Sequence, residues 1–275
     1  MSGRIFLYNA SGVAIGGTIS QPFKADIETN SATSLPIIGG FASAKSENYE
    51  LKDVISFRSA HTYVSGIETA DRAHHTVATC IVEGLNILDV ITADAIMGRL
   101  SAKQQNDEQP EIIPLGSSFD NLKIAGCPVH VDLNYDFFLE YPTHSALLAQ
   151  YESGSSAESA NAPKARYQWG LSSQKIPPSL AEGMLMEPGV GWQRSNGVLY
   201  TSIVKQVRPV GTGNSLEELP YAYAIHIPQV GNLYLGELFA SADTKRLCML
   251  RIELGCPFVG AMAAAVPLTN GSWYP

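Results

Sequence analysis

The chain has 275 residues, a formal net charge of −8 and a charged fraction of 16%, below the roughly 25% that is common in soluble domains. Its basic residues form no stripe of the kind that phosphate backbones require, so we expect no nucleic-acid partner. No window approaches the about 18 apolar residues of a membrane-spanning helix, and the apolar stretch after Met1 is too short for an export signal. We therefore expect no transmembrane segment and a cytoplasmic location, the alternative being an extracellular one if a leader had been trimmed.

The first elements read as strands. Residues 4–8 and 13–19 alternate apolar side chains, and residues 9–12 between them contain the asparagine and glycine that tight turns favour, which predicts an opening hairpin. Residues 54–58 and 62–65 predict two further strands that pair with each other.

A short repeat follows within residues 77–133. The six residues from Val82 recur from Phe119, and each copy leads into a second strand-like run that ends in an acid, Asp94 or Asp132. Each copy spaces its apolar side chains by two apart from one slip, at a glycine in the first copy and at an asparagine in the second. This spacing is typical of strands, not helices.

The pattern changes at about residues 143–195. Residues 144–151 predict a short helix capped by Thr143, and a second brief helix is expected from Ser179, so this segment is interpreted as a helical insertion. Strand patterns return from residue 198, and residues 230–239 and 246–254 predict a hairpin that turns through 241–244. The C-terminal tail, 258–275, is apolar and needs a groove, its own or a neighbour's.

These elements predict a single domain over residues 1–275 that is mainly β. We expect an antiparallel sandwich-like or barrel-like fold with a short helical insertion. The alternative is a β-solenoid in which the two repeat copies stack as successive turns.

Residues 76–133 resemble the core pattern of bacterial choice-of-anchor P proteins. The resemblance is carried by residues 85–94 and by the small-residue strand and turn at 116–126, and more weakly by the hairpin at 231–253. Two features depart from that pattern: Asp89 stands where glycine is expected, and no export signal is visible. The resemblance implies a β-rich fold and assigns no chemistry.

No cofactor-binding or metal-binding motif is present in the sequence. His74 and His75 are adjacent, so in a strand their side chains point to opposite faces and cannot bind one ion together. Four cysteines are present and share no close spacing: Cys80, Cys127, Cys248 and Cys256. Because no signal peptide is visible, we expect reduced, buried thiols and not two disulfides.

Weak catalytic candidates are His130, Asp132 and Asp94. His130 and Asp132 lie on one face of a strand and could act as a base with its orienting acid, although a surface contact is the commoner outcome. Asp94 and Asp132 end equivalent runs and could act as paired carboxylates, although a turn contact is simpler. Glu237 and Arg251 on the late hairpin are better explained as a cross-strand ion pair.

The charge-poor surface favours a non-enzymatic self-assembling or binding module that forms homo-oligomers. Trp273 and Tyr274 in the tail are the candidate assembly residues. The alternative is an enzyme or small-molecule-binding protein with a polar pocket inside the β scaffold. The sequence does not identify a ligand.

Overall fold

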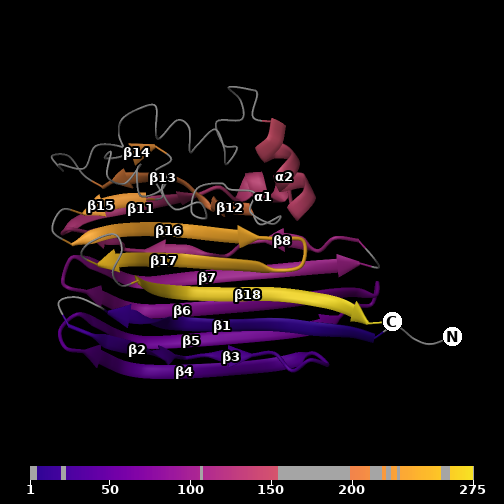
Figure 1. Ribbon diagram of the computed structural model, residues 1–275, viewed down its shortest axis with the longest axis horizontal. Coiled ribbons are helices and arrows are strands. Elements are labelled where there is room, and N and C mark those ends of the chain that lie inside the picture. The colour runs from indigo at the N-terminus through magenta and orange to yellow at the C-terminus, as the bar shows by residue number, and fades with distance from the viewer. Residues whose placement is uncertain are drawn as a thin grey trace.

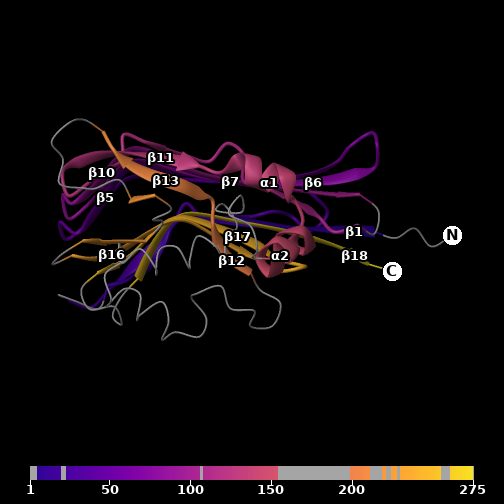
Figure 2. The same cartoon turned by 90° about the horizontal axis from the view of Figure 1, so that it is seen from above.

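The computed structural model describes residues 5–19, 23–105, 108–153, 199–210, 219–220, 224–227, 230–254 and 261–274. The described strands form two antiparallel sheets that pack face to face as two layers (Figures 1 and 2). The expected sandwich is therefore confirmed. The described strands form neither a closed barrel nor a solenoid.

The first sheet has eight strands, and its main path runs β12-β16-β17-β18-β1-β2, with β15 beside β16 and β3 beside β1. Its strands are β1 (Ile5–Ile19), β2 (Ala25–Asn30), β3 (Thr33–Ser34), β12 (Leu199–Ser202), β15 (Ala224–Ile227), β16 (Gly231–Ala240), β17 (Lys245–Leu254) and β18 (Ala261–Tyr274).

The second sheet has ten strands, with the main path β14-β13-β11-β10-β7-β6-β5-β4 and with β8 and β9 both paired to β7. Its strands are β4 (Gly40–Leu51), β5 (Ile55–Glu68), β6 (Ala73–Ile87), β7 (Ile91–Gln105), β8 (Glu111–Ile113), β9 (Ser118–Asp120), β10 (Lys123–Ile124), β11 (Cys127–Leu133), β13 (Val204–Pro209) and β14 (Leu219–Pro220).

Two short helices follow the second sheet, α1 (Tyr135–Glu140) and α2 (His144–Ser153). Helix α2 confirms the helix expected at 144–151, and Thr143 Oγ1 accepts a hydrogen bond from the Ala146 amide as an N-cap does (3.2 Å). The rest of the expected insertion, including the brief helix expected from Ser179, lies outside the described residues.

The C-terminal tail is a strand of the first sheet. β18 lies between β17 and β1, and its Tyr274 pairs with Ile5 at the end of the sandwich where both chain ends lie (Figure 1). The tail therefore packs within its own chain, as a strand between β17 and β1.

The hairpin expected within residues 4–19 is wrong, because β1 continues straight through residues 9–12. Gly12 serves close packing and not a turn: a Cβ added there would lie 2.6 Å from Thr62 Cγ2 and 2.7 Å from Cys80 Sγ in the facing sheet. The two strands expected at 54–58 and 62–65 are likewise one strand, β5.

The two repeat copies lie on opposite sides of β7 in one sheet. Val82 and Phe119 both pair with Ile96, and Ile87 and Ile124 both pair with Ile91. The repeat is therefore a pair of equivalent neighbours of one strand, which is why the stacked turns of a solenoid do not form.

A line of irregular positions crosses the second sheet through β4, β5, β6, β7 and the short link between β9 and β10: Asn48, Arg58, Gly84, Asp94 and Asn121. The ladders skip these positions without losing register; for example, Glu83 pairs with Ala95 and the next pair is Leu85 with Ala93. Three of the five residues have left-handed backbone: Asn48 (φ 51°), Gly84 (φ 63°) and Asn121 (φ 49°). We call this set the kink line.

The kink line changes which residues face the core. In β7, Ile91 and Ala93 are buried before Asp94 and Ile96 is buried after it, a spacing of three where a regular strand requires an even number. The first sheet has a similar line, in which Gly236 (φ 62°) and Ala265 (φ 54°) are left-handed. In both sheets the set of alternate residues that faces the core therefore shifts by one position part-way along the strands.

Candidate functional site

His130 and Asp132 meet on β11, as the sequence predicts. His130 Nε2 lies 3.0 Å from Asp132 Oδ1. Arg208 on the neighbouring β13 binds the same carboxylate twice, through Nε at 2.8 Å and Nη2 at 3.1 Å. The imidazole is open to solvent, because 62% of the His130 side chain is exposed.

The electrostatics of this cluster favour a charged carboxylate. Hydrogen bonding from Arg208, with a smaller contribution from His130, lowers the pKa of Asp132. Asp132 therefore stays ionised near neutral pH and cannot donate a proton there. It can orient His130, but water surrounds that base on the outside of the sheet.

Asp94 and Asp132 are not brought together. Asp94 accepts a hydrogen bond from Asn121 Nδ2 at 2.6 Å, on the kink line, whereas Asp132 binds Arg208. β10 lies between β7 and β11, the strands that carry the two carboxylates. Asp94 lies inside β7 and not at a strand end, so the expected turn contact is wrong: its bond to Asn121 crosses to the neighbouring segment, and it forms no carboxylate pair with Asp132.

Trp273 and Tyr274 lie in the β18 ladder, where their backbones pair with Phe6 and Ile5 of β1. Their segment holds the first sheet together, so removing it would remove part of an inner strand.

His74 and His75 lie on opposite faces of β6, as expected. His74 is buried between the sheets, where its Nδ1 lies 2.8 Å from Tyr8 Oη and its ring stacks on Phe6 with centroids 4.0 Å apart. Burial lowers the pKa of His74, so the ring is held neutral. Within the described residues, no group of three or more His, Cys, Asp or Glu side chains is placed to hold a metal ion.

Three cysteines are described, and all three are free thiols. Burial raises the pKa of Cys80 and of Cys248 to about 12, so both remain protonated and are poor nucleophiles. Cys127 is half-buried at the start of β11. Cys256 lies outside the described residues.

Lys245 is a buried lysine at the start of β17, with 1% of its surface exposed. Its Nζ donates a hydrogen bond to the Ala242 carbonyl in the β16–β17 turn at 2.8 Å, and burial lowers its pKa to about 8. This hydrogen bond stabilises the turn, so we interpret Lys245 as a structural residue.

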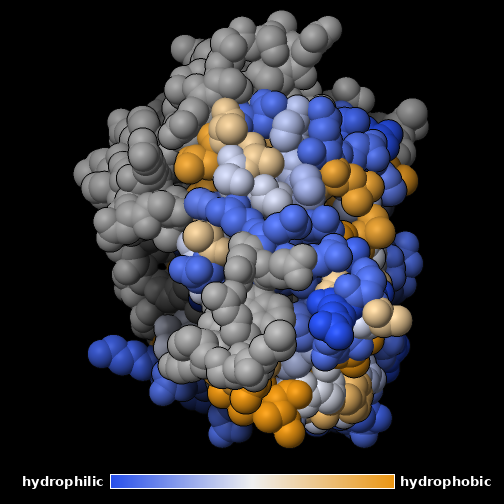
Figure 3. All heavy atoms as spheres, turned by 90° about the vertical axis from the view of Figure 1, so that its right-hand side faces the viewer, coloured by the Kyte–Doolittle hydropathy of each residue, from blue (hydrophilic) through white to orange (hydrophobic). Residues whose placement is uncertain are grey.

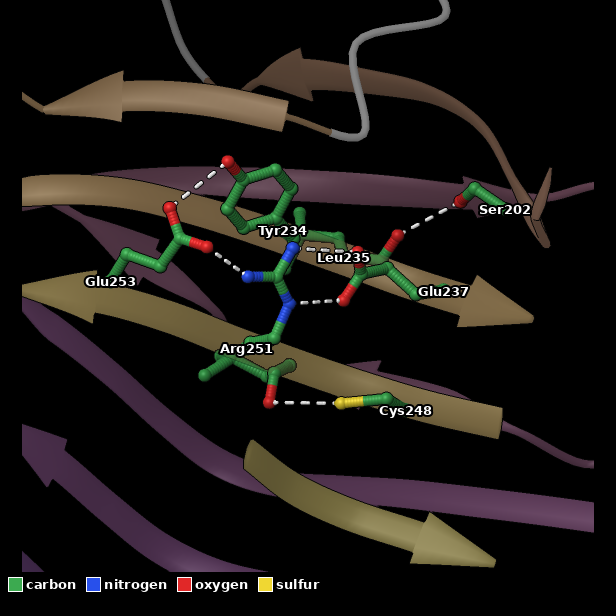
Figure 4. Close-up of polar contacts among 8 residues, drawn as sticks. Ser202, Tyr234, Leu235, Glu237, Cys248, Arg251 and Glu253 are labelled. Atoms are coloured by element: carbon green, nitrogen blue, oxygen red, sulfur yellow. Dashed lines mark hydrogen bonds and ion pairs between the residues drawn. The ribbon is translucent and has the colours of Figure 1, made fainter. Parts of the chain in front are cut away.

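The expected Glu237–Arg251 pair is confirmed and belongs to a larger network on β16 and β17 (Figure 4). Arg251 binds both carboxylate oxygens of Glu237, at 2.7 and 2.8 Å, and also binds Glu253. The guanidinium lies over the Tyr234 ring, 3.7 Å from its centroid, and Tyr234 Oη donates to Glu253 at 3.2 Å. One arginine therefore binds two glutamates in a largely buried place, which leaves the three side chains with one net negative charge.

Gly236 makes this network possible. Tyr234 and Glu237 are three residues apart and would point to opposite faces of a regular strand, but the left-handed Gly236 between them lets both reach Arg251. Burial alone would lower the pKa of Arg251, but the bonds from Glu237 and Glu253 outweigh it and raise the pKa. The arginine is therefore permanently charged and fully paired, so the network suits cohesion better than chemistry.

A cluster of exposed apolar side chains lies at the end of the sheet where β4 begins and β5 ends. It consists of Ile37, Ile38, Phe41, Tyr63 and Ile67, which we call the β4–β5 patch. Phe41 pairs with Ser65, so the outward-facing Tyr63 and Ile67 flank it on the next strand. Figure 3 shows hydrophobic residues gathered at the lower edge of this end of the sandwich, at the level of β3 and β4.

The patch is open and aromatic. Ile38 is 82% exposed and Phe41 is 63% exposed, although large apolar side chains on solvent-facing strands are usually covered. The Phe41 and Tyr63 ring centroids lie 6.4 Å apart, and the His61 ring is parallel to that of Tyr63 within 3°. Sequence analysis missed this patch, because alternation shows which residues share a face but not which face is outside.

The comparisons with known proteins place the chain in a family. A family model described as a domain of unknown function, DUF8256, matches residues 6–241. The chain belongs to this family. The DUF8256 match spans the whole ten-stranded sheet and the β4–β5 patch, and it ends before β17 and β18.

No curated protein and no solved structure matches this DUF8256 chain. The comparisons do not link it to choice-of-anchor P proteins, so that resemblance stays an expectation. No helix among the described residues is long and apolar enough to cross a membrane.

Proposed function

We propose that this DUF8256 chain is a non-enzymatic self-assembling module that associates with further copies through the β4–β5 patch. The observation that carries the proposal is the exposed Phe41 and Tyr63 side by side on the outer face of β4 and β5, with the exposed Ile38 in the turn that leads into β4. Burying one such side chain contributes about 1.5–3 kcal/mol, and aromatic residues are enriched in interface cores. The low charged fraction of 16% supports the same role.

The assembly surface that we propose is not the one that the sequence suggests, Trp273 and Tyr274. The backbones of these two residues pair with β1, and their role in assembly stays a prediction. Phe41 and Tyr63 of the β4–β5 patch are exposed while the β4–β5 ladder holds their backbone, which keeps this part of the surface rigid before association.

An enzyme or small-molecule binder remains the competing proposal, and the 3.0 Å contact between His130 and Asp132 is the observation that favours it. The pair lies on an exposed face and its carboxylate is already bound by Arg208. Native mass spectrometry tests this proposal: a small molecule retained by the wild type and lost from His130→Ala supports a site at the pair.

Size-exclusion chromatography with light scattering tests the assembly proposal. We expect the wild-type chain to show a mass that rises with concentration and Phe41→Ser to shift it toward one chain. Leu139→Ser on α1 is the matched control, because Leu139 is also apolar and 55% exposed but lies away from the patch. Equal masses for the wild type and Phe41→Ser would contradict the proposal.

A further inference from the structure

Among the described strands, β4 is the terminal strand of the ten-stranded sheet, and a terminal strand presents unpaired backbone groups along its outer edge. Ser31 Oγ donates to the Ala44 carbonyl at 2.7 Å, so this carbonyl points away from β5. The β4–β5 ladder runs without a skip from Gly40 to Glu47. Because backbone direction repeats every second residue in a regular strand, Ala42 also directs its N–H and C=O groups toward the edge.

The open part of this edge is short and uncharged. Ser31 covers the edge at residues 44–46, where its amide also bonds Ser46 Oγ at 3.1 Å. Lys45 and Glu47 form an exposed ion pair just beyond, and charges of this kind discourage pairing with foreign strands. Residues 40–43 (Gly-Phe-Ala-Ser) carry no charge and lie directly beside the β4–β5 patch.

We propose that a second copy of the chain adds to the sheet at this edge, with the two β4 strands antiparallel about a two-fold axis at Ala42. This inference rests on the proposed self-association and names its geometry. Ala42 then pairs with Ala42 of the second copy, and its N–H and C=O groups bond those of that residue. The pairing ends before Ala44, whose carbonyl Ser31 already binds.

A second copy fits this edge because the segment is complementary to itself. The two-fold axis sets Phe41 opposite Ser43 of the other copy and joins the two β4–β5 patches into one apolar surface. Lys45 is the only charged side chain in residues 39–45, and it would face Gly39, so no like charges meet. The pairing uses the same segment of both chains and therefore closes as a dimer.

Ala42→Pro tests the pairing, because proline removes the outward N–H of Ala42 and is tolerated at strand edges. We expect its dimer dissociation constant, measured by sedimentation velocity, to be about tenfold or more above that of the wild type. Ala42→Ser is the matched control; it keeps the N–H and should stay within about twofold. Circular dichroism should show the same strand content in all three proteins.

A second measurement covers a proline variant that fails to fold. In the wild type, amide hydrogen exchange in residues 40–44 should slow as the concentration rises, while exchange in residues 129–133 of β11 should not change. Exchange in residues 40–44 that is independent of concentration in a dimeric sample would overturn the edge pairing.

The outcomes separate this inference from the proposed function. If Phe41→Ser dissociates the dimer and a folded Ala42→Pro does not, the patch is the interface and the edge pairing is wrong. If the wild type has the mass of one chain at every concentration, both proposals are wrong.

Discussion

Gly84 and Asn121 occupy equivalent positions on the two sides of β7. Both are left-handed, and in both ladders the skipped position opposite them is Asp94. Asn121 donates its side-chain amide to Asp94 at 2.6 Å. Asparagine and glycine are the residues that tolerate this conformation. The glycine and the asparagine that interrupt the apolar spacing of the two repeat copies are therefore the residues of the kink line.

Replacing Asn121 with a β-branched residue should destabilise the fold. We expect Asn121→Val to lower the free energy of unfolding by about 1–3 kcal/mol, because valine is strained at positive φ. Asn121→Gly should cost about 1 kcal/mol, mainly through the lost bond to Asp94. Urea unfolding measures both. Lys123→Val, at an exposed strand position with regular backbone, is the control, and an equal loss in Lys123→Val would contradict the explanation.

Adding a methyl group at Gly12 should disturb the contact between the two sheets. The Cβ would lie 2.6 Å from Thr62 Cγ2 and 2.7 Å from Cys80 Sγ, so Gly12→Ala should cost about 1–3 kcal/mol in unfolding free energy. The double change Thr62→Ser with Cys80→Ala should restore part of that loss in the Gly12→Ala background. Gly16→Ala has contacts no shorter than 3.7 Å and should cost about 1 kcal/mol or less.

Removing Arg251 alone should lower the free energy of unfolding more than removing both Arg251 and Glu237. We expect Arg251→Met to lose about 3–5 kcal/mol, since it leaves Glu237 charged and nearly buried. Adding Glu237→Leu to Arg251→Met should recover part of that loss, because the uncompensated charge is gone. A thermal-denaturation double-mutant cycle measures the difference; losses that simply add would show that the pair is not coupled.

The folded chain should lose stability as the pH drops below about 6.5, the usual pKa of histidine. Burial holds His74 below that value in the folded chain, so the unfolded chain binds a proton first and is favoured as the pH falls. The urea midpoint of the wild type should therefore drop between pH 7.5 and pH 5, and the drop should be smaller in His74→Gln. Equal drops in the two proteins would assign the effect to other groups.

The sequence predicts the fold class because strand alternation is a local signal. It identifies the β16–β17 hairpin, its turn and the Glu237–Arg251 pair, since all three depend on residues close in the chain. It wrongly predicts a turn at residues 9–12, because glycine is needed at position 12 for close packing against Thr62 and Cys80. These two side chains approach Gly12 only after the sheets pack.

The candidate sites show the same limit. His130 and Asp132 are two residues apart, so their contact can be predicted, whereas Arg208 reaches Asp132 only through the β11–β13 ladder. The β4–β5 patch joins residues from a loop and two strands, and its exposure depends on which face of the sheet stays uncovered. Periodicity alone carries neither kind of information.

The most direct test of the account is the mass of the unmodified chain by sedimentation equilibrium over a hundredfold range of concentration. The account predicts a rise from one chain toward two, with no larger species. A single-chain mass at every concentration would contradict self-association through the β4–β5 patch.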